Sequence, residues 1–212
     1  MTNLILIRHG ESEANRMGVF AGHIDPDLQG RGVKQAELTA EYIAGNYSVD
    51  KVYSSDLKRA YRTAKSLADK LGLEIIPDVR LREIDGGKWE NVKFEDIVKL
   101  YPEEFGMWIN DIGNAACPDG ESVAELGERI MEVLEEIAVN NVGKTVAIAT
   151  HATPIRVAQG IIQTSGLGEM KDIPYVSNAS VTHLEYDGDW RVLKAGEDAH
   201  LAELRTSLPH NI

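Results

Sequence analysis

The chain has 212 residues, of which 43% are hydrophobic and 26% charged, and its formal net charge at pH 7 is −12. This composition is ordinary for a globular protein, and no apolar run approaches the roughly 18 residues that a membrane helix needs. The acidic balance argues against nucleic acid and anionic membranes as partners, because both bind proteins that concentrate lysine and arginine.

We expect residues 1–212 to form one domain, because no long Pro-, Gly- or Ser-rich linker divides the chain. The N-terminus shows no basic region followed by an apolar segment and a cleavage site, so a cytoplasmic location is expected. The single cysteine, Cys117, cannot form a disulfide within the chain and has no neighbouring histidine or cysteine for a metal site. We therefore interpret it as an inert thiol.

The first half of the chain alternates between short apolar runs and amphipathic stretches, bounded by glycine, proline or capping residues. Ser54, Ser55 and Asp56 are typical N-cap residues for a helix that follows them. The pattern predicts, in order, a strand over 4–7, a polar loop, a helix over about 33–43, a strand over 51–53, a helix over 57–71 and a strand over 74–76.

The second half of the chain continues this alternation. A lid or insertion at about 91–120, interrupted by Pro102, is predicted to hold one or two short amphipathic helices. Ser122 and Glu125 have the pattern of a capping box and open a helix that ends near Val139. The chain then continues with a buried strand over 145–150, a helix over about 154–162 and a hairpin of strands over 180–186 and 190–194. The repeated strand-to-helix steps predict an α/β fold.

Two histidines and two arginines occupy comparable places in these steps. His9, beside Arg8, ends the first strand, and His151 ends the last buried strand. Open α/β sheets bind ligands outside the carboxyl ends of their strands, so both imidazoles are expected at one edge. Arg59 lies at a third strand-to-helix junction, and Arg62 follows it by one helical turn. Because histidine offers a nucleophilic nitrogen and arginine binds phosphate bidentately, this set indicates phosphoryl chemistry.

Simpler interpretations stay open for each residue taken alone. A lone histidine at a strand end commonly bonds to a backbone carbonyl, and Arg62 fits equally well on a solvated helix face. An acidic protein that handles phosphate must create local positive potential against its overall field. Its site arginines should therefore be clustered and partly desolvated.

Five groups of residues, in this order, resemble the histidine phosphatase superfamily, which includes phosphoglycerate mutases and many small acid phosphatases. The resemblance covers nearly the whole chain. It implies a three-layer α/β/α sandwich with a mostly parallel central sheet, like that of phosphoglycerate mutase. The groups are Arg8-His9-Gly10-Glu11-Ser12 with Asn15; Ser54-Ser55-Asp56-Leu57-Lys58-Arg59-Ala60 with Thr63-Ala64; Leu81-Arg82-Glu83 with Gly87 and Trp89-Glu90; Gly120-Glu121-Ser122; and His151 after an apolar strand.

The resemblance implies that His9 attacks phosphorus in line and carries the phosphoryl group as a phosphohistidine. A covalent intermediate divides one difficult displacement into two easier ones. The other ring nitrogen should donate to a backbone carbonyl, which keeps the attacking nitrogen unprotonated. Arg8, Arg59 and a protonated His151 would bind the phosphoryl oxygens, with Asn15 adding neutral hydrogen bonds. Such a site calls for no metal and no cofactor.

Glu83 matches the family position of the general acid that protonates the leaving oxygen. A carboxyl beside an anionic phosphate favours its protonated form, and after departure of the alcohol it could activate water. From sequence alone, an equally simple interpretation is a surface ion pair of Glu83 with Arg80 or Arg82.

Substrate identity is expected to reside in two segments, the loop over 20–23 and the lid over 93–108. Ala152 and Asn91 stand where the family commonly has glycine, and alanine tolerates positive φ poorly. A methyl group at residue 152 could therefore crowd the substrate. The candidate substrate-binding residues are Asn15, Arg62, Gly22, His23 and Ala152.

These observations favour a hydrolase that acts on a small phosphorylated metabolite. A phosphoglycerate mutase is the nearer alternative, but Lys93 and Lys99 are the only cations between residues 91 and 120 that could hold a substrate carboxylate. A binding module that has lost turnover is the remote alternative. A metal-dependent phosphatase would need scattered ligands such as His23, Asp25 and Asp27. A homodimer through an edge strand is conceivable, although nothing in the sequence requires one.

Overall fold

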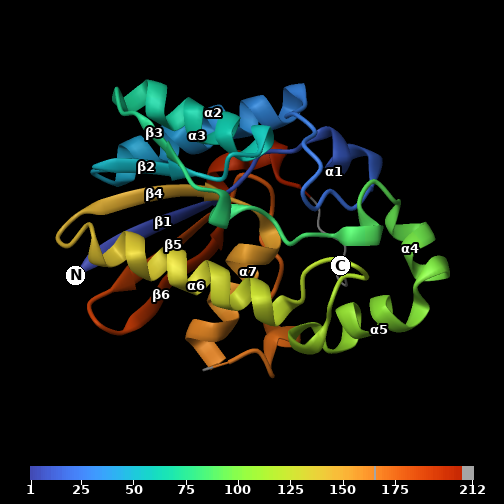
Figure 1. Cartoon of the computed structure of the whole chain (residues 1–212). Coiled ribbons are helices and arrows are strands. Elements are labelled where there is room, and N and C mark those ends of the chain that lie inside the picture. Colours follow the sequence, from blue (N-terminus) through green and yellow to red (C-terminus); the bar gives the residue numbers. More distant parts are fainter. Residues whose placement is uncertain (165, 207–212) are drawn as a thin grey trace.

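The computed structural model describes residues 1–164 and 166–206, which are built around a mixed six-stranded sheet (Figure 1). The strand order is β3-β2-β4-β1-β5-β6. β3, β2, β4 and β1 run parallel to one another, whereas β5 and β6 are antiparallel to their neighbours. The strands are β1 (Thr2–Arg8), β2 (Lys51–Ser54), β3 (Ile75–Pro77), β4 (Thr145–Thr150), β5 (Val181–Tyr186) and β6 (Trp190–Glu197).

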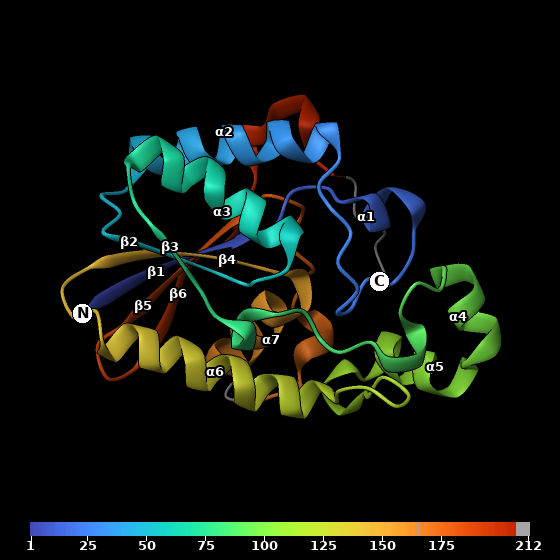
Figure 2. The same ribbon diagram turned by 45° about the horizontal axis from the view of Figure 1, so that its top comes forward.

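Helices cover both faces of the sheet (Figure 2). α2 (Gly30–Asn46) and α3 (Lys58–Leu71) lie on one face, and α6 (Val123–Val139) and α7 (Ala152–Thr164) lie on the other. The side chains of β1 alternate between these layers, because successive residues of a strand point to opposite faces. Leu4 and Leu6 join the hydrophobic cluster under α6 and α7, and Ile5 and Ile7 join the cluster under α2 and α3. The predicted three-layer α/β/α sandwich is confirmed.

The shorter helices lie beside the carboxyl ends of the parallel strands (Figure 2). α4 and α5 are separated at Tyr101, directly before Pro102, as the sequence predicts. Phe105 and Trp108 of α5 pack into the larger hydrophobic cluster together with Trp89. These helices are α1 (Glu13–Met17), α4 (Phe94–Leu100) and α5 (Pro102–Asn110), and 3-10 turns cover Val79–Leu81, Gly87–Trp89, Ile112–Asn114, Met170–Asp172 and Ala199–Leu204.

The structure corrects two local predictions. The five-residue helix α1 occupies part of the predicted polar loop, with a capping box at its start in which Ser12 and Asn15 bond reciprocally. The predicted N-cap of α3 is wrong: the helix begins at Lys58 after Leu57, which makes no side-chain capping bond. Ser55 instead turns its hydroxyl toward the second histidine, as described below.

The other predicted elements are present with shifted ends. The capping box of Ser122 and Glu125 opens α6 as predicted. α2 and α7 extend beyond their predicted ranges at both ends, and β5 and β6 form the predicted antiparallel hairpin. Within the described residues, no helix is both long enough and apolar enough to cross a lipid bilayer.

Candidate active site

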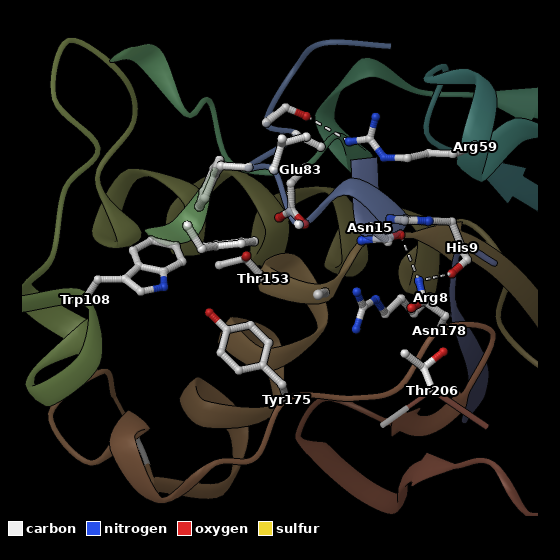
Figure 3. Close-up of a pocket in the computed structure, with 17 residues that line it drawn as sticks. Arg8, His9, Asn15, Arg59, Glu83, Trp108, Thr153, Tyr175, Asn178 and Thr206 are labelled. Atoms are coloured by element: carbon white, nitrogen blue, oxygen red, sulfur yellow. Dashed lines mark hydrogen bonds between the residues drawn. The ribbon is translucent and has the colours of Figure 1, made fainter. Parts of the chain in front are cut away.

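A pocket of about 300 Å³ opens at the edge of the sheet where β1 and β4 end. Arg8, His9, Asn15 and Asn178 lie on one side of the pocket, and Trp108 lies on the other (Figure 3). The lining residues are Arg8, His9, Asn15, Gly18, Val19, Phe20, Ala21, Gly22, Arg59, Glu83, Phe94, Trp108, Ala152, Thr153, Tyr175, Asn178 and Thr206.

His9 directly follows β1 and is 4% exposed. Its Nδ1 lies 2.8 Å from the carbonyl oxygen of Gly10, so the ring proton is donated there and the lone pair lies on Nε2. Burial, and then the positive charges of Arg59 and Arg8, hold the pKa of His9 well below its ordinary value of 6.5. The imidazole is therefore neutral at neutral pH, as a nucleophile must be.

Arg8 and Arg59 are the two buried cations of the pocket, 7% and 0% exposed. Nη1 of Arg8 donates to the carbonyl of Val176 at 2.5 Å. Arg59 donates from both terminal nitrogens, to the carbonyls of Ile24 and Gly22, each at 2.8 Å. Burial lowers the pKa of Arg8 to about 10 and also lowers that of Arg59, yet both stay charged at neutral pH. The structure thus has the clustered, desolvated arginines expected of an acidic protein that binds an anion.

His151 lies beside His9, with 5.1 Å between the ring centroids, and has no exposed surface. Its Nε2 lies 2.9 Å from Oγ of Ser55, which also accepts a bond from the backbone N–H of Leu57. If the hydroxyl donates to Nε2, the proton of neutral His151 is on Nδ1, a buried atom without a hydrogen-bond partner among the described residues. His151 is not among the residues that line the pocket, so its expected contact with a phosphoryl oxygen stays a prediction.

The residues around His151 do not favour the protonated form that the sequence analysis expects. Burial, followed by the charge of Arg59, holds the pKa of His151 well below 6.5. The ring can therefore donate one hydrogen bond in its neutral form, but it adds no positive charge to the site at neutral pH. The positive charges of the pocket lining are the guanidinium groups of Arg8 and Arg59.

Asn15 and Asn178 connect the pocket to the backbone around His9. The amide of Asn178 donates to the carbonyl of His9 at 3.1 Å and to Oδ1 of Asn15 at 3.2 Å (Figure 3). Oδ1 of Asn15 also accepts from the backbone N–H and the hydroxyl of Ser12, each at 3.0 Å. Because its oxygen is fully used, the group that Asn15 offers to a ligand is its NH₂, which is the donor expected for a phosphate contact.

Glu83 lines the pocket, and its Oε1 accepts the backbone N–H of Ile84 at 3.0 Å. The alternative ion pairs for this carboxylate are not formed. Arg80 pairs with Asp78 and Glu136, and Arg82 pairs with Asp56, which leaves Glu83 facing the pocket.

A family model for the histidine phosphatase superfamily (branch 1) matches residues 4–198. The chain belongs to the histidine phosphatase superfamily. Phosphoserine phosphatase 1 of Hydrogenobacter thermophilus is 40% identical over 156 residues, which are 74% of this chain and 74% of that protein. Phosphoglycerate mutase-like protein 4 of Arabidopsis thaliana is 31% identical over 204 residues, which cover 94% of this chain and 87% of that protein.

Two solved structures have folds similar to that of this chain. YhfR of Bacillus stearothermophilus has a TM-score of 0.89 at 28% identity, over 95% of this chain and 100% of that chain. A mutant phosphoserine phosphatase of Entamoeba histolytica, in complex with phosphoserine, has a TM-score of 0.82 at 29% identity, with the same coverage of 95% and 100%. The relatives thus include phosphatases and mutase-like proteins.

In this histidine phosphatase, two predicted substrate-binding residues lie outside the pocket lining. Arg62 lies one helical turn beyond Arg59 and pairs on the surface with Asp27, at 2.7 Å. Asp27 belongs to the loop before α2. His23 does not line the pocket, and its Nε2 lies 2.8 Å from the carbonyl oxygen of Glu83. Asp25 pairs with Lys58, so the three scattered ligands considered for a metal have separate partners.

Gly22 and Ala152, by contrast, do line the pocket. Ala152 begins α7 and is not among the residues with positive φ, so its methyl group causes no backbone strain. Asn91 does adopt a positive φ, of 61°, which asparagine tolerates. The concern about positive φ therefore applies at residue 91 and not at residue 152, whereas the Ala152 methyl group does lie at the pocket, where crowding of the substrate stays a prediction.

Sequence reasoning missed six lining residues, which are Gly18, Val19, Thr153, Tyr175, Asn178 and Thr206. Tyr175 and Asn178 lie in the loop before the strand β5, and only the sheet topology brings that loop to the site. This strand is antiparallel to β1, with Ile7 opposite Val181, so the start of β5 meets the end of β1. The pairing of β5 with β1 would have placed this loop at the site.

Proposed function

We propose that the protein is a phosphomonoesterase that cleaves small phosphorylated metabolites through a phosphohistidine on His9, without a metal or cofactor. One observation carries this proposal. A buried, neutral imidazole is fixed by the Gly10 carbonyl in the tautomer that attacks, and two buried guanidiniums lie beside it. Donors fixed in a buried site stabilise the charge of a passing phosphoryl group without reorganising.

The reaction proceeds in two displacements. In the first, Nε2 of His9 bonds to phosphorus while the bond from phosphorus to the leaving oxygen breaks, and Glu83 gives its proton to that oxygen. In the second, water bonds to phosphorus, the phosphorus–nitrogen bond breaks, and Glu83 takes the proton from water. The products are an alcohol and inorganic phosphate, and His9 and Glu83 return to their starting forms.

Aromatic residues of the pocket lining would contact the leaving group of the substrate. Phe20 packs edge-to-face on Phe94 and on Trp108, with ring centroids 5.8 and 5.7 Å apart, and all three rings line the pocket. Tyr175 also lines the pocket, and the guanidinium of Arg156 lies over its ring, 4.2 Å from the ring centroid. Such walls favour a leaving group with an apolar or aromatic surface. Rates on such substrates are to be compared with the rate on phosphoserine, which the mutant Entamoeba enzyme binds.

The test is hydrolysis of p-nitrophenyl phosphate by the full chain with EDTA present, followed by a panel of alkyl and aryl phosphates. We expect turnover by the wild type, and loss of both turnover and acid-labile ³²P labelling in His9→Ala. Wild type that binds phosphate without turnover would identify a binding module. Activity lost on chelation would identify a metal-dependent enzyme. Transfer of the label to a second alcohol in preference to water would favour a mutase.

A further inference from the structure

Arg129, on α6, reaches the segment of chain that carries Glu83. Its Nη1 donates to the carbonyl of Arg80 at 2.6 Å and to that of Arg82 at 3.1 Å, and its Nη2 donates to the carbonyl of Glu83 at 3.3 Å. The Arg129 side chain is 21% exposed, so these bonds are partly shielded from water. One guanidinium therefore gathers three carbonyl groups at and just before the proposed acid.

Glu121 fixes the orientation of that guanidinium. Its two carboxylate oxygens accept from Nε and Nη2 of Arg129 at 2.9 and 2.8 Å, the bidentate geometry that holds a guanidinium in one plane. The same residue reaches the far side of Glu83. Its Oε2 accepts the N–H of Asp85 at 3.1 Å, and its backbone N–H donates to the Asp85 carbonyl at 2.9 Å. The pair of Arg129 and Glu121 thus holds the chain on both sides of Glu83.

His23 approaches the Glu83 carbonyl from the loop after α1. Its Nε2 lies 2.8 Å from that oxygen, so with the ring proton on Nε2 it donates there beside Arg129. The backbone N–H of His23 donates in turn to Oε1 of Glu90 at 2.6 Å, and the same oxygen accepts the N–H of Gly86. The backbone of Glu83 is therefore held from two elements that are far apart in the sequence.

We propose that Arg129, oriented by Glu121, is a positioning residue that holds Glu83 at the leaving oxygen. This proposal rests on the proposed function, in which Glu83 is the acid. A proton donor acts only within hydrogen-bond reach of the leaving oxygen, and a small displacement of its backbone is costly to the rate. Arg129 does not line the pocket, so it acts through Glu83 and not on the substrate.

Arg80 provides a matched control. It also links this segment to α6, through Glu136 at 2.6 Å, and it pairs with Asp78 at 2.7 Å. The hydrogen bonds of the Arg80 side chain go to those two carboxylates and not to the carbonyl of Glu83. Loss of Arg80 therefore weakens the attachment to α6 without removing a bond to the acid.

The experiment compares two leaving groups in Arg129→Met, Arg129→Lys, Glu121→Gln and Arg80→Met. One substrate is p-nitrophenyl phosphate, whose leaving group needs little protonation. The other is the alkyl phosphate with the highest kcat/KM in the wild-type panel. We expect Arg129→Met to lower kcat/KM for the alkyl phosphate about tenfold or more beyond any loss on nitrophenyl phosphate, within the range of general acid catalysis. Arg129→Lys should lose less of the ratio of kcat/KM for the alkyl phosphate to that for nitrophenyl phosphate, and Arg80→Met should leave this ratio unchanged.

Equal losses on the two substrates in Arg129→Met would overturn the proposal, as would an equal shift of the ratio in Arg80→Met. If Arg129→Met fails to fold, Arg129→Lys and Glu121→Gln should lower the ratio of kcat/KM for the alkyl phosphate to that for nitrophenyl phosphate by a smaller factor. Wild-type ratios in both variants would overturn the proposal. A double variant with Glu83→Gln should show no further change in the ratio. Absence of wild-type turnover on nitrophenyl phosphate would instead contradict the proposed function, so the two failures are distinguishable.

Discussion

Nδ1 of His9 lies 2.8 Å from the carbonyl oxygen of Gly10, the next residue in the chain. This acceptor is held in place, because Gly10 packs so closely on Gly32 of α2 that a Cβ at residue 10 would overlap the Gly32 carbonyl. The tautomer and the orientation of the imidazole are therefore set by backbone atoms. A nucleophile fixed in this way needs no side-chain partner to direct its attack.

The first prediction concerns the protonation of His9. Burial and two neighbouring cations favour the neutral ring, so its pKa lies well below 6.5. A lowered pKa means that the nucleophilic form persists as the pH falls below 6.5, where an ordinary histidine takes up a proton. In ¹⁵N NMR of the phosphate-free protein, the His9 ring should remain neutral at pH 6. A titration midpoint near 6.5 would contradict this assignment.

The second prediction concerns Glu83. Glu83→Gln keeps the size of the side chain and removes the proton, so it should slow alkyl phosphates by about 10²-fold or more, the lower range of general acid catalysis. Nitrophenyl phosphate should lose far less, because its leaving group departs as a stable anion. The measurement is kcat/KM for both substrates, with Arg80→Met as the control variant outside the pocket. Equal losses on both substrates would remove Glu83 from the role of acid.

The positions of the proposed catalytic residues could be predicted from sequence because parallel strands impose a common geometry. His9 and His151 each follow a strand of the parallel part of the sheet, and Arg59 begins the helix after another such strand. The carboxyl ends of these strands share one edge, so their positions along the chain determine where the side chains meet.

Other features depend on contacts that a linear pattern does not contain. Arg62 matches Arg59 in helical position, but its pairing with Asp27 is formed by a loop folded back from before α2. The neutral state of His151 follows from its complete burial, which spacing along the chain does not reveal. The place of Tyr175 in the pocket follows from the antiparallel pairing of β5 with β1, a topology that no local signal specifies.

The third prediction concerns the positive φ of Asn91. The backbone N–H of Asn91 donates to the carbonyl of Phe20 at 2.9 Å, so its turn supports the aromatic wall of the pocket. Asn91→Ala should destabilise the protein by about 1 kcal/mol, because alanine keeps the Cβ but lacks the short polar side chain that makes the left-handed region accessible to asparagine. Asn91→Gly should change the free energy of unfolding by less than about 0.5 kcal/mol. Urea denaturation of both variants checks this, and an alanine variant as stable as the glycine variant would argue against strain at this position.

The last prediction concerns Ser55, whose hydroxyl lies 2.9 Å from Nε2 of His151. Ser55→Ala removes the group that fixes the His151 tautomer and leaves a second buried ring nitrogen unpartnered, a cost of about 1–3 kcal/mol. Because we expect His151 to bind a phosphoryl oxygen, kcat/KM should fall about tenfold or more on alkyl and nitrophenyl phosphates alike. Ser54→Ala is the matched control, since the Ser54 hydroxyl is also buried but donates to the Ser55 carbonyl at 2.7 Å. A loss confined to alkyl phosphates would instead connect Ser55 to the leaving group, and wild-type rates would show that the His151 tautomer does not depend on it.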